Sequence, residues 1–214
     1  MPTGRNAAIV GAQRAAPIRA VIFDVYGTLV EIGAKRWPFV KLARATANPR
    51  DALRSVLTTP LGLQEAALAF DCGDIPLAVL AEDLEIELAS VSLFPEVGET
   101  LGAVRARGLK IGIASNLAAP YAAPVKRVLP FALDVYGWSF EIGFMKPHPA
   151  HYRWVCRQLR VAPEEALMIG DTLDADFHGA RACGLRAAYL ARDGGITASN
   201  VPSIQTLDEI LAWL

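Results

Sequence analysis

Five short, largely apolar runs, each followed by polar or turn-forming residues, constrain the fold of this chain more than any other feature. Runs of this kind are typical of strands that are buried on both faces of a parallel sheet. Helical patterns separate them, and this alternation indicates β-α units joined by right-handed crossovers. We therefore predict an α/β fold built on a parallel sheet, with strands at 20–23, 109–114, 131–136, 166–169 and 186–190.

The helical patterns show where the alternation holds and where it stops. They cover 95–107, 150–159 and 175–183, and Gly108 and Gly184 suit the C-caps of two of these helices. Between 36 and 92 the sequence predicts three or four helices and no strand, which is too long for an ordinary connection. We expect a flexible tail at 1–18, an α/β core at 19–32 and 95–214, and a small helical insert at 33–94.

Composition excludes several classes of protein. Hydrophobic residues make up 53% of the 214 residues and charged residues 20%, which excludes a disordered chain. The formal net charge of -1 argues against binding of nucleic acid or an anionic membrane, and no apolar run is long enough to span a bilayer. The three cysteines are scattered, without the spacing of a zinc site or a disulfide framework. These features predict a cytoplasmic protein with no nucleic-acid or membrane partner.

Polar residues that could take part in catalysis or ligand binding lie at the predicted carboxyl ends of the strands, where open parallel sheets bind ligands. Asp24, Ser115 and Asp171 follow the runs at 20–23, 109–114 and 166–169. Lys146 lies in the loop after the run at 131–136. Each alone could order a turn, cap a helix or face solvent. Together, at one edge of one sheet, they predict a functional site.

The motifs around these residues resemble those of the haloacid dehalogenase (HAD) superfamily, whose four signature motifs occur in the right order between 19 and 190. They are Phe-Asp-Val-Tyr-Gly-Thr-Leu at 23–29, Ala-Ser-Asn at 114–116, Lys-Pro-His-Pro at 146–149, and Ile-Gly-Asp at 169–171 with Asp176 and Gly-Ala at 179–180. The resemblance implies a Rossmann-like core, with helices on both faces of the sheet, and an α-helical cap inserted after the first motif. It leaves a monomer or a homodimer open.

The resemblance also implies roles for the site residues. Asp24 would be a nucleophile that forms an aspartyl intermediate, and Lys146 would neutralise charge. Thr28 and Ser115 would bind oxygens of the transferred group, and the substrate-binding set would be Tyr26, Gly27 and Asn116. The ligands of a Mg²⁺ ion would be Asp24, the backbone carbonyl of Tyr26, Asp171 and Asp176, the last through water or by holding Lys146. Asp174 is expected to be a solvated helix charge.

One position departs from the phosphatases of the superfamily. Tyr26 stands where they carry a second Asp as general acid and base, and this form of the first motif resembles the 2-haloacid dehalogenase branch. Halide leaves without a proton, so that branch needs no acid there. The fourth motif, Gly-Asp-Thr with Asp176, has instead the acidic form of the phosphatases. Arg36 is near the place of a halide-binding arginine, but its neighbours do not match, and a solvated charge is the simpler interpretation.

We therefore predict an HAD hydrolase, with Mg²⁺-dependent hydrolysis of a small phosphorylated metabolite as the first hypothesis. A metal-independent 2-haloacid dehalogenase and a catalytically weak binding protein are the alternatives. A cap over the site favours a small-molecule substrate over a folded protein. His148 and His151 could supply a substitute acid, although a position on the surface or behind the site is the simpler interpretation of each. Trp37, Phe39 and Phe70 could line the cleft, although core packing within the helices explains them better.

Overall fold

The core of the protein is a parallel sheet with the first strand at its centre. In the computed structural model, which describes residues 16–194 and 201–214, six strands form this sheet in the order β5-β4-β1-β6-β7-β8. All of its pairings are parallel, which confirms the predicted α/β fold. The strands are β1 (Ala20–Phe23), β4 (Lys110–Ser115), β5 (Val135–Trp138), β6 (Ala166–Gly170), β7 (Arg186–Leu190) and β8 (Ser203–Ile204).

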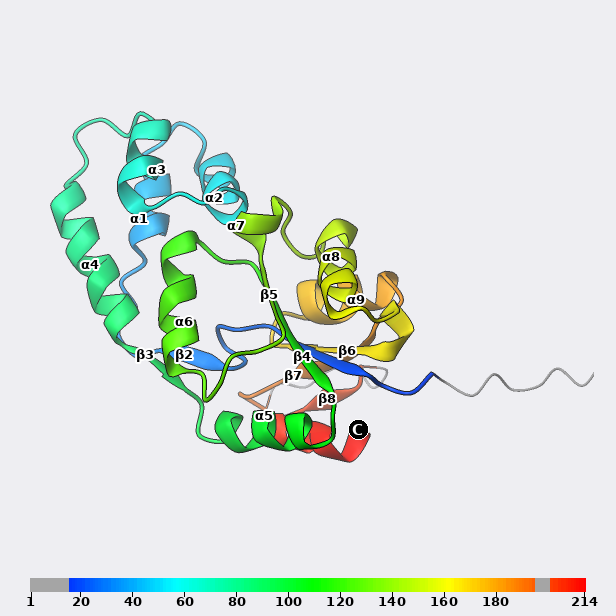
Figure 1. Cartoon of the computed structure of the whole chain (residues 1–214). Coiled ribbons are helices and arrows are strands. Elements are labelled where there is room, and N and C mark those ends of the chain that lie inside the picture. The colour runs from blue at the N-terminus through cyan, green and yellow to red at the C-terminus, as the bar shows by residue number, and fades with distance from the viewer. Residues whose placement is uncertain (1–15, 195–200) are drawn as a thin grey trace, which may run out of the picture.

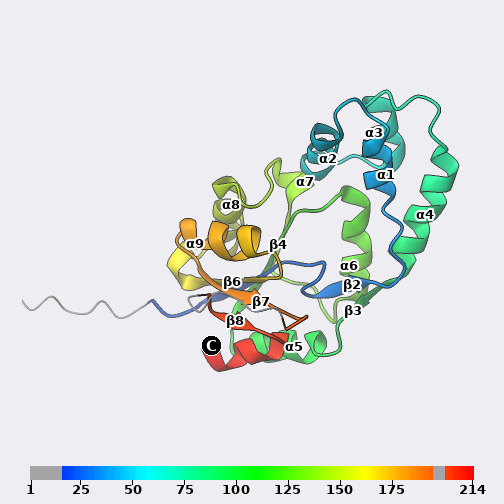
Figure 2. The same cartoon turned by 180° about the vertical axis from the view of Figure 1, so that it is seen from behind.

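Helices cover both faces of the sheet because the strands are apolar on both sides. Val21 and Phe23 of β1 face one core cluster, and Ala20 and Ile22 face the other. The first cluster lies under α5 (Val97–Ala106), α6 (Ala122–Val128) and the C-terminal η4 (Leu207–Trp213). The second lies under α8 (Pro149–Leu159) and α9 (Gly179–Ala182), which Figures 1 and 2 show on the opposite side of the sheet from α5.

A group of helices is inserted between two short strands that pair with each other, β2 (Val30–Ile32) and β3 (Val91–Leu93). This fully described segment contains α1 (Pro38–Arg44), α2 (Pro49–Thr58), α3 (Leu63–Ala69) and α4 (Leu77–Ala89), which gather beyond one end of the sheet (Figure 1). The helices share a separate apolar cluster that includes Phe39, Leu42, Val56 and Leu80. We refer to α1–α4 as the helical insert.

Several predicted boundaries were wrong. The strand predicted at 131–136 begins only at Val135, because Asp134 still belongs to the turn, where its carboxylate accepts a hydrogen bond of 2.8 Å from the backbone N–H of Ile111. The helix predicted at 175–183 is divided into a π-helix, Leu173–His178, and α9. β3 falls inside the stretch expected to hold only helices, and neither β2 nor β8 was predicted.

The remaining elements are α7 (Ser139–Ile142) and three-residue 3₁₀ turns, Ala119–Tyr121 (η1) and Pro163–Glu165 (η2). Cys72, Cys156 and Cys183 are free, in agreement with the absence of a predicted disulfide framework. Among the described helices, none combines the length and apolarity that crossing a bilayer requires. Residues 1–15 of the predicted tail lie outside the described residues, whereas Ile18 packs against the core.

Candidate active site

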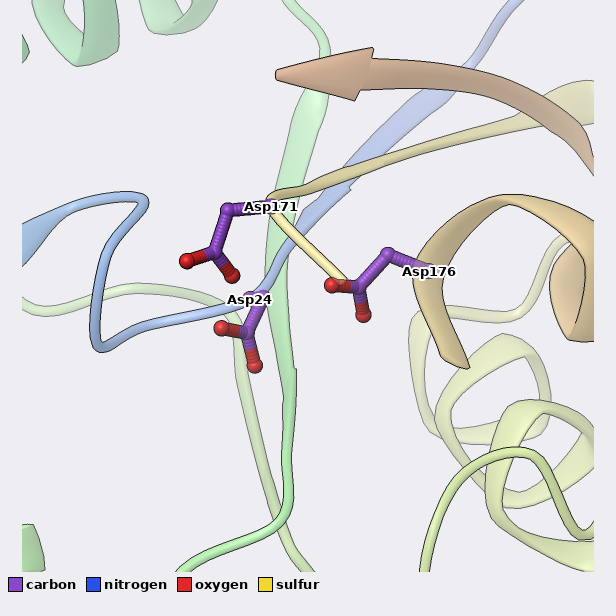
Figure 3. Close-up of side chains that lie close together, drawn as sticks. All are labelled: Asp24, Asp171 and Asp176. Carbon is purple, nitrogen blue, oxygen red and sulfur yellow. The ribbon is translucent and has the colours of Figure 1, made fainter. Parts of the chain in front are cut away.

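Three carboxylates meet at the carboxyl edge of the sheet. Asp24 follows β1 and Asp171 follows β6, and these strands are neighbours in register from Ala20 to Phe23. Asp176 approaches from the π-helix that comes next in the chain, and Figure 3 shows the three side chains around one space. One carboxylate oxygen of each lies within 4.8 Å of the others. The site therefore forms at the point where the strand order reverses, as open α/β sheets predict.

Two glycines allow these carboxylates to come so close to the backbone. A Cβ atom on Gly27, which has a φ of 88°, would lie 2.0 Å from Oδ2 of Asp171. A Cβ atom on Gly170 would lie 2.2 Å from the carboxylate of Asp176. Any side chain at either position would displace an acidic residue of the site.

Lys146 holds two of the three carboxylates. Its Nζ donates to Oδ1 of Asp24 at 2.8 Å and to Oδ1 of Asp176 at 2.5 Å, and the residue is 3% exposed. Burial alone would lower the pKa of Lys146, but the two carboxylates raise it above its ordinary value. Burial raises the pKa of Asp171, and the charge of Asp24 raises it further. One ammonium among three carboxylates leaves an excess of negative charge in a buried place.

The donor set fits a hard divalent cation. Mg²⁺ binds oxygen at about 2.1 Å, so ligands on opposite sides of one ion lie about 4.2 Å apart. The three carboxylate oxygens lie within 4.8 Å of one another, a limit that includes this separation. Asp24 and Asp171 are the simplest direct ligands. Both oxygens of Asp176 already accept hydrogen bonds, from Lys146 and from the backbone N–H of Thr172 at 2.9 Å. Asp176 therefore contacts Lys146, one of the two expected arrangements. Its action through water, and direct ligation by Asp176 or by the carbonyl of Tyr26, stay predictions.

The second motif positions the lysine. The Nδ2 atom of Asn116 donates to the carbonyl oxygen of Lys146 at 2.8 Å, and the backbone N–H of Lys146 donates to Oδ1 of Asn116 at 2.7 Å. The amide of Asn116 therefore clamps the lysine backbone, and its predicted contact with substrate stays a prediction. Ser115 is 2% exposed at the end of β4. Thr28 is fully buried, and its Oγ1 has no hydrogen-bond partner among the described residues.

Tyr26 is not arranged as an acid or a base. Its hydroxyl donates to the carbonyl oxygen of Tyr121 at 3.1 Å, so its proton is already engaged. Burial raises the pKa of Tyr26 far above its ordinary value, and the negative charge of Glu87 adds to this effect. The hydroxyl therefore stays neutral at physiological pH and does not replace the missing aspartate.

The other sequence candidates lie outside the carboxylate cluster. Arg36, His148 and Asp174 are exposed, as the simpler interpretation of each predicted. Phe39 is buried and Phe70 is partly buried in the core of the helical insert. Trp37 is 55% exposed and lines a cavity of about 700 Å³ that also reaches Tyr26 and Asp171.

His151 is buried, and its neutral form is fixed by its surroundings. Its Nδ1 lies 2.8 Å from the carbonyl oxygen of Phe144, so Nδ1 carries the proton, while Nε2 is buried with no hydrogen-bond partner among the described residues. Desolvation lowers the pKa of His151 to about 4. A neutral histidine with this pKa cannot serve as a general acid near pH 7.

This pKa predicts an acid-sensitive stability. The unfolded chain takes up a proton near pH 6.5 and the folded chain does so only near pH 4, so the contribution of His151 is complete above pH 6.5 and is lost as the pH falls through about 4. The loss amounts to about 3 kcal/mol of unfolding free energy. Urea unfolding between pH 7 and pH 4 should show a weaker pH dependence in His151→Gln than in wild type. His148→Gln, which changes an exposed histidine, should keep the wild-type dependence; equal slopes in all three proteins would contradict the assignment.

Sequence reasoning missed three residues that organise the site. Arg192 donates to the carbonyl oxygens of Gly27 and Thr28 at 3.1 and 2.7 Å and pairs with Glu96 at 2.7 Å, which fixes the turn after the nucleophile position. Glu87 and Tyr121 connect the helical insert to the core. None of the three belongs to a local motif, and each lies far along the chain from the residues it contacts.

Comparisons with known proteins find similar sequences. A family model described as haloacid dehalogenase-like hydrolase matches residues 18–184. The phosphoglycolate phosphatase of Shigella dysenteriae is 33% identical over 199 residues, an alignment that covers 78% of this chain and 79% of the relative.

Solved structures of both branches share the fold. An HAD phosphatase from Thermococcus onnurineus superposes with a TM-score of 0.67 and 25% identity, over 92% of this chain and 97% of the other. A 2-haloacid dehalogenase from Pseudomonas syringae gives a TM-score of 0.65 and 25% identity, over 92% and 100%. The fold therefore does not separate a phosphatase from a dehalogenase, and the choice depends on the site.

Proposed function

Because this chain belongs to the haloacid dehalogenase-like hydrolases, we propose that it is a Mg²⁺-dependent phosphatase for a small phosphorylated metabolite. The observation that carries the proposal is the cluster of Asp24, Asp171 and Asp176, which gathers more negative charge around one lysine than that lysine balances. A metal-free dehalogenase would gain nothing from the additional acids. The identity to phosphoglycolate phosphatases makes 2-phosphoglycolate the first natural substrate to test.

In this mechanism Asp24 attacks phosphorus and the leaving group departs, after which water hydrolyses the aspartyl phosphate. Asp24 is suited to attack because Lys146 fixes its Oδ1, so that the carboxylate is held in one orientation. Mg²⁺, when bound by Asp24 and Asp171, would neutralise charge on the phosphoryl oxygens. The Lys146 ammonium adds to that neutralisation, and Ser115, at the end of the neighbouring strand, would bind a phosphoryl oxygen.

The leaving group receives no proton from Tyr26, because that hydroxyl is bonded to Tyr121. Aryl phosphates therefore suit a first assay, since a phenolate leaves with little acid assistance. The helical insert, for which we propose the role of a cap spanning about 33–94, would bring the remaining contacts to the substrate. The cavity of about 700 Å³ beside Asp171 has the volume for a small molecule.

The test is phosphate release from an aryl phosphate, with Mg²⁺ and with a chelator. We expect release that needs Mg²⁺ and falls more than about 100-fold in Asp171→Asn, because a direct metal ligand is lost. Asp174→Asn is the matched control: it removes an exposed carboxylate three residues away and should keep wild-type activity. Halide release from a 2-haloacid that survives chelation, without phosphate release, would overturn the proposal in favour of a dehalogenase.

A further inference from the structure

Glu87, in the last turn of α4, is a buried carboxylate that the proposed chemistry does not use. It is 1% exposed, and the described residues show no ion pair to it. Its Oε1 accepts the backbone N–H groups of Arg36 and of Trp37, the latter at 2.7 Å, and its Oε2 accepts the hydroxyl of Tyr121. A buried charge without a cation is costly unless its hydrogen bonds are complete, so these donors define where Glu87 can remain.

The donors come from the two sides of a joint. Arg36 and Trp37 belong to the connection that enters the helical insert, and this connection lies against the returning one: the N–H groups of Gly33 and Ala34 bond to the carbonyl and hydroxyl oxygens of Ser90 at 3.3 and 3.1 Å. Tyr121 belongs instead to the core, in η1 after β4. Glu87 therefore binds the insert to the core at the place where the chain passes between them.

The contacts continue from Tyr121 toward the nucleophile position. The carbonyl oxygen of Tyr121 accepts the hydroxyl of Tyr26, and the two rings meet edge to face with centroids 5.8 Å apart. Phe39 of α1 packs against Tyr121 from the insert side, with centroids 6.1 Å apart. Tyr26 lies two residues after Asp24. An unbroken series of contacts thus links the insert joint to the loop that carries the candidate nucleophile.

We propose that Glu87, Tyr121 and Tyr26 form a latch that holds the helical insert in place over the strand ends and couples its position to the loop of Asp24. Glu87 and Tyr121 are positioning residues in this latch. Tyr26 stands at the position of the usual acid, and its hydrogen bond to Tyr121 depends on how the helical insert is placed. The latch depends on neither the substrate nor the metal, so it stands apart from the proposed phosphatase activity.

Hydrogen exchange of the backbone amides of Arg36 and Trp37 tests the latch without any activity assay. Tyr121→Phe removes only the hydroxyl that Glu87 accepts, and it should raise exchange of these amides about 10-fold. Tyr26→Phe does not touch the joint, yet the coupling predicts a rise of about 3-fold there as well. Tyr136→Phe is the matched control, because its hydroxyl accepts from the N–H of Leu133 in the core, and it should leave the joint at the wild-type rate.

Both tyrosine variants keep their rings, so folding is preserved and can be verified by the exchange of core amides. Wild-type exchange at Arg36 and Trp37 in Tyr121→Phe would overturn the latch. A wild-type rate in Tyr26→Phe would overturn its coupling to the nucleophile loop, and a rise in Tyr136→Phe equal to that in Tyr121→Phe would show a general loosening in place of a latch. Loss of phosphatase activity alone decides none of these outcomes, so the two proposals fail separately.

Discussion

Replacing Asp24 with asparagine is expected to reduce Mg²⁺-dependent phosphate release by more than about 10⁴-fold, because an amide oxygen cannot take the place of a carboxylate nucleophile. The substitution keeps the shape of a residue that is 8% exposed, and Lys146 keeps its ion pair with Asp176 at 2.5 Å, so the fold should survive. The measurement is phosphate release by purified variant and wild type under the same conditions, with Asp174→Asn as the matched control. Residual activity within 10-fold of wild type would contradict a nucleophilic role.

Incorporation of ¹⁸O from water then identifies the atom that water attacks, phosphorus or the carboxyl carbon of Asp24. In the proposed phosphatase, Asp24 forms a bond to phosphorus while the bond from phosphorus to the leaving oxygen breaks, and water next attacks phosphorus and releases the carboxylate. In a single turnover in H₂¹⁸O, the label should therefore enter phosphate and not the peptide containing Asp24. A dehalogenase forms a carboxylate ester that water attacks at the carboxyl carbon, which would place the label in Asp24. Mass spectrometry of the released phosphate and of the peptide containing Asp24 distinguishes these outcomes.

The sequence predicted the sheet because its strands are buried on both faces, and a short apolar run is a local signal. The central strand illustrates this: Val21 and Phe23 enter one core cluster and Ala20 and Ile22 the other, so all four positions had to be apolar. β8 escaped prediction because a two-residue edge strand, Ser203–Ile204, has no periodicity to detect. The predicted start of β5 was wrong because Asp134, just before this strand, still belongs to the turn and its carboxylate accepts a hydrogen bond there.

The candidate site was predictable to the extent that its residues lie at strand ends within recognisable motifs. Asp24, Lys146, Asp171 and Asp176 meet as expected, although their catalytic roles stay predictions. The contacts of Glu87 could not be predicted, since its carboxylate binds Trp37, 50 residues earlier, and Tyr121, 34 residues later. Such contacts depend on how the insert packs on the core, and a helical pattern in the sequence does not contain that information.

Replacing the buried Lys146 is expected to have a large effect on stability. Lys146→Met should lower the free energy of unfolding by about 3–5 kcal/mol, because Asp24 and Asp176 lose the cation that pairs with both of them in a buried cluster. Lys41→Met is the matched control, since Lys41 pairs with Asp83 at 2.7 Å, nearly the same length, but has a 48% exposed side chain. A solvent-exposed pair contributes about 1 kcal/mol or less. Urea unfolding at pH 7 measures both losses.

A second substitution separates charge from packing. If the loss in Lys146→Met comes from uncompensated carboxylates, then Lys146→Met combined with Asp176→Asn should be more stable than Lys146→Met alone, because one of those charges has been removed. If the loss comes from the packing of the lysine side chain, the double variant should be no more stable than the single one. A cost for Lys146→Met no greater than that for Lys41→Met would contradict both explanations. Phosphate release should be lost in the double variant even where stability returns, since the cation that fixes Asp24 and neutralises the substrate is still absent.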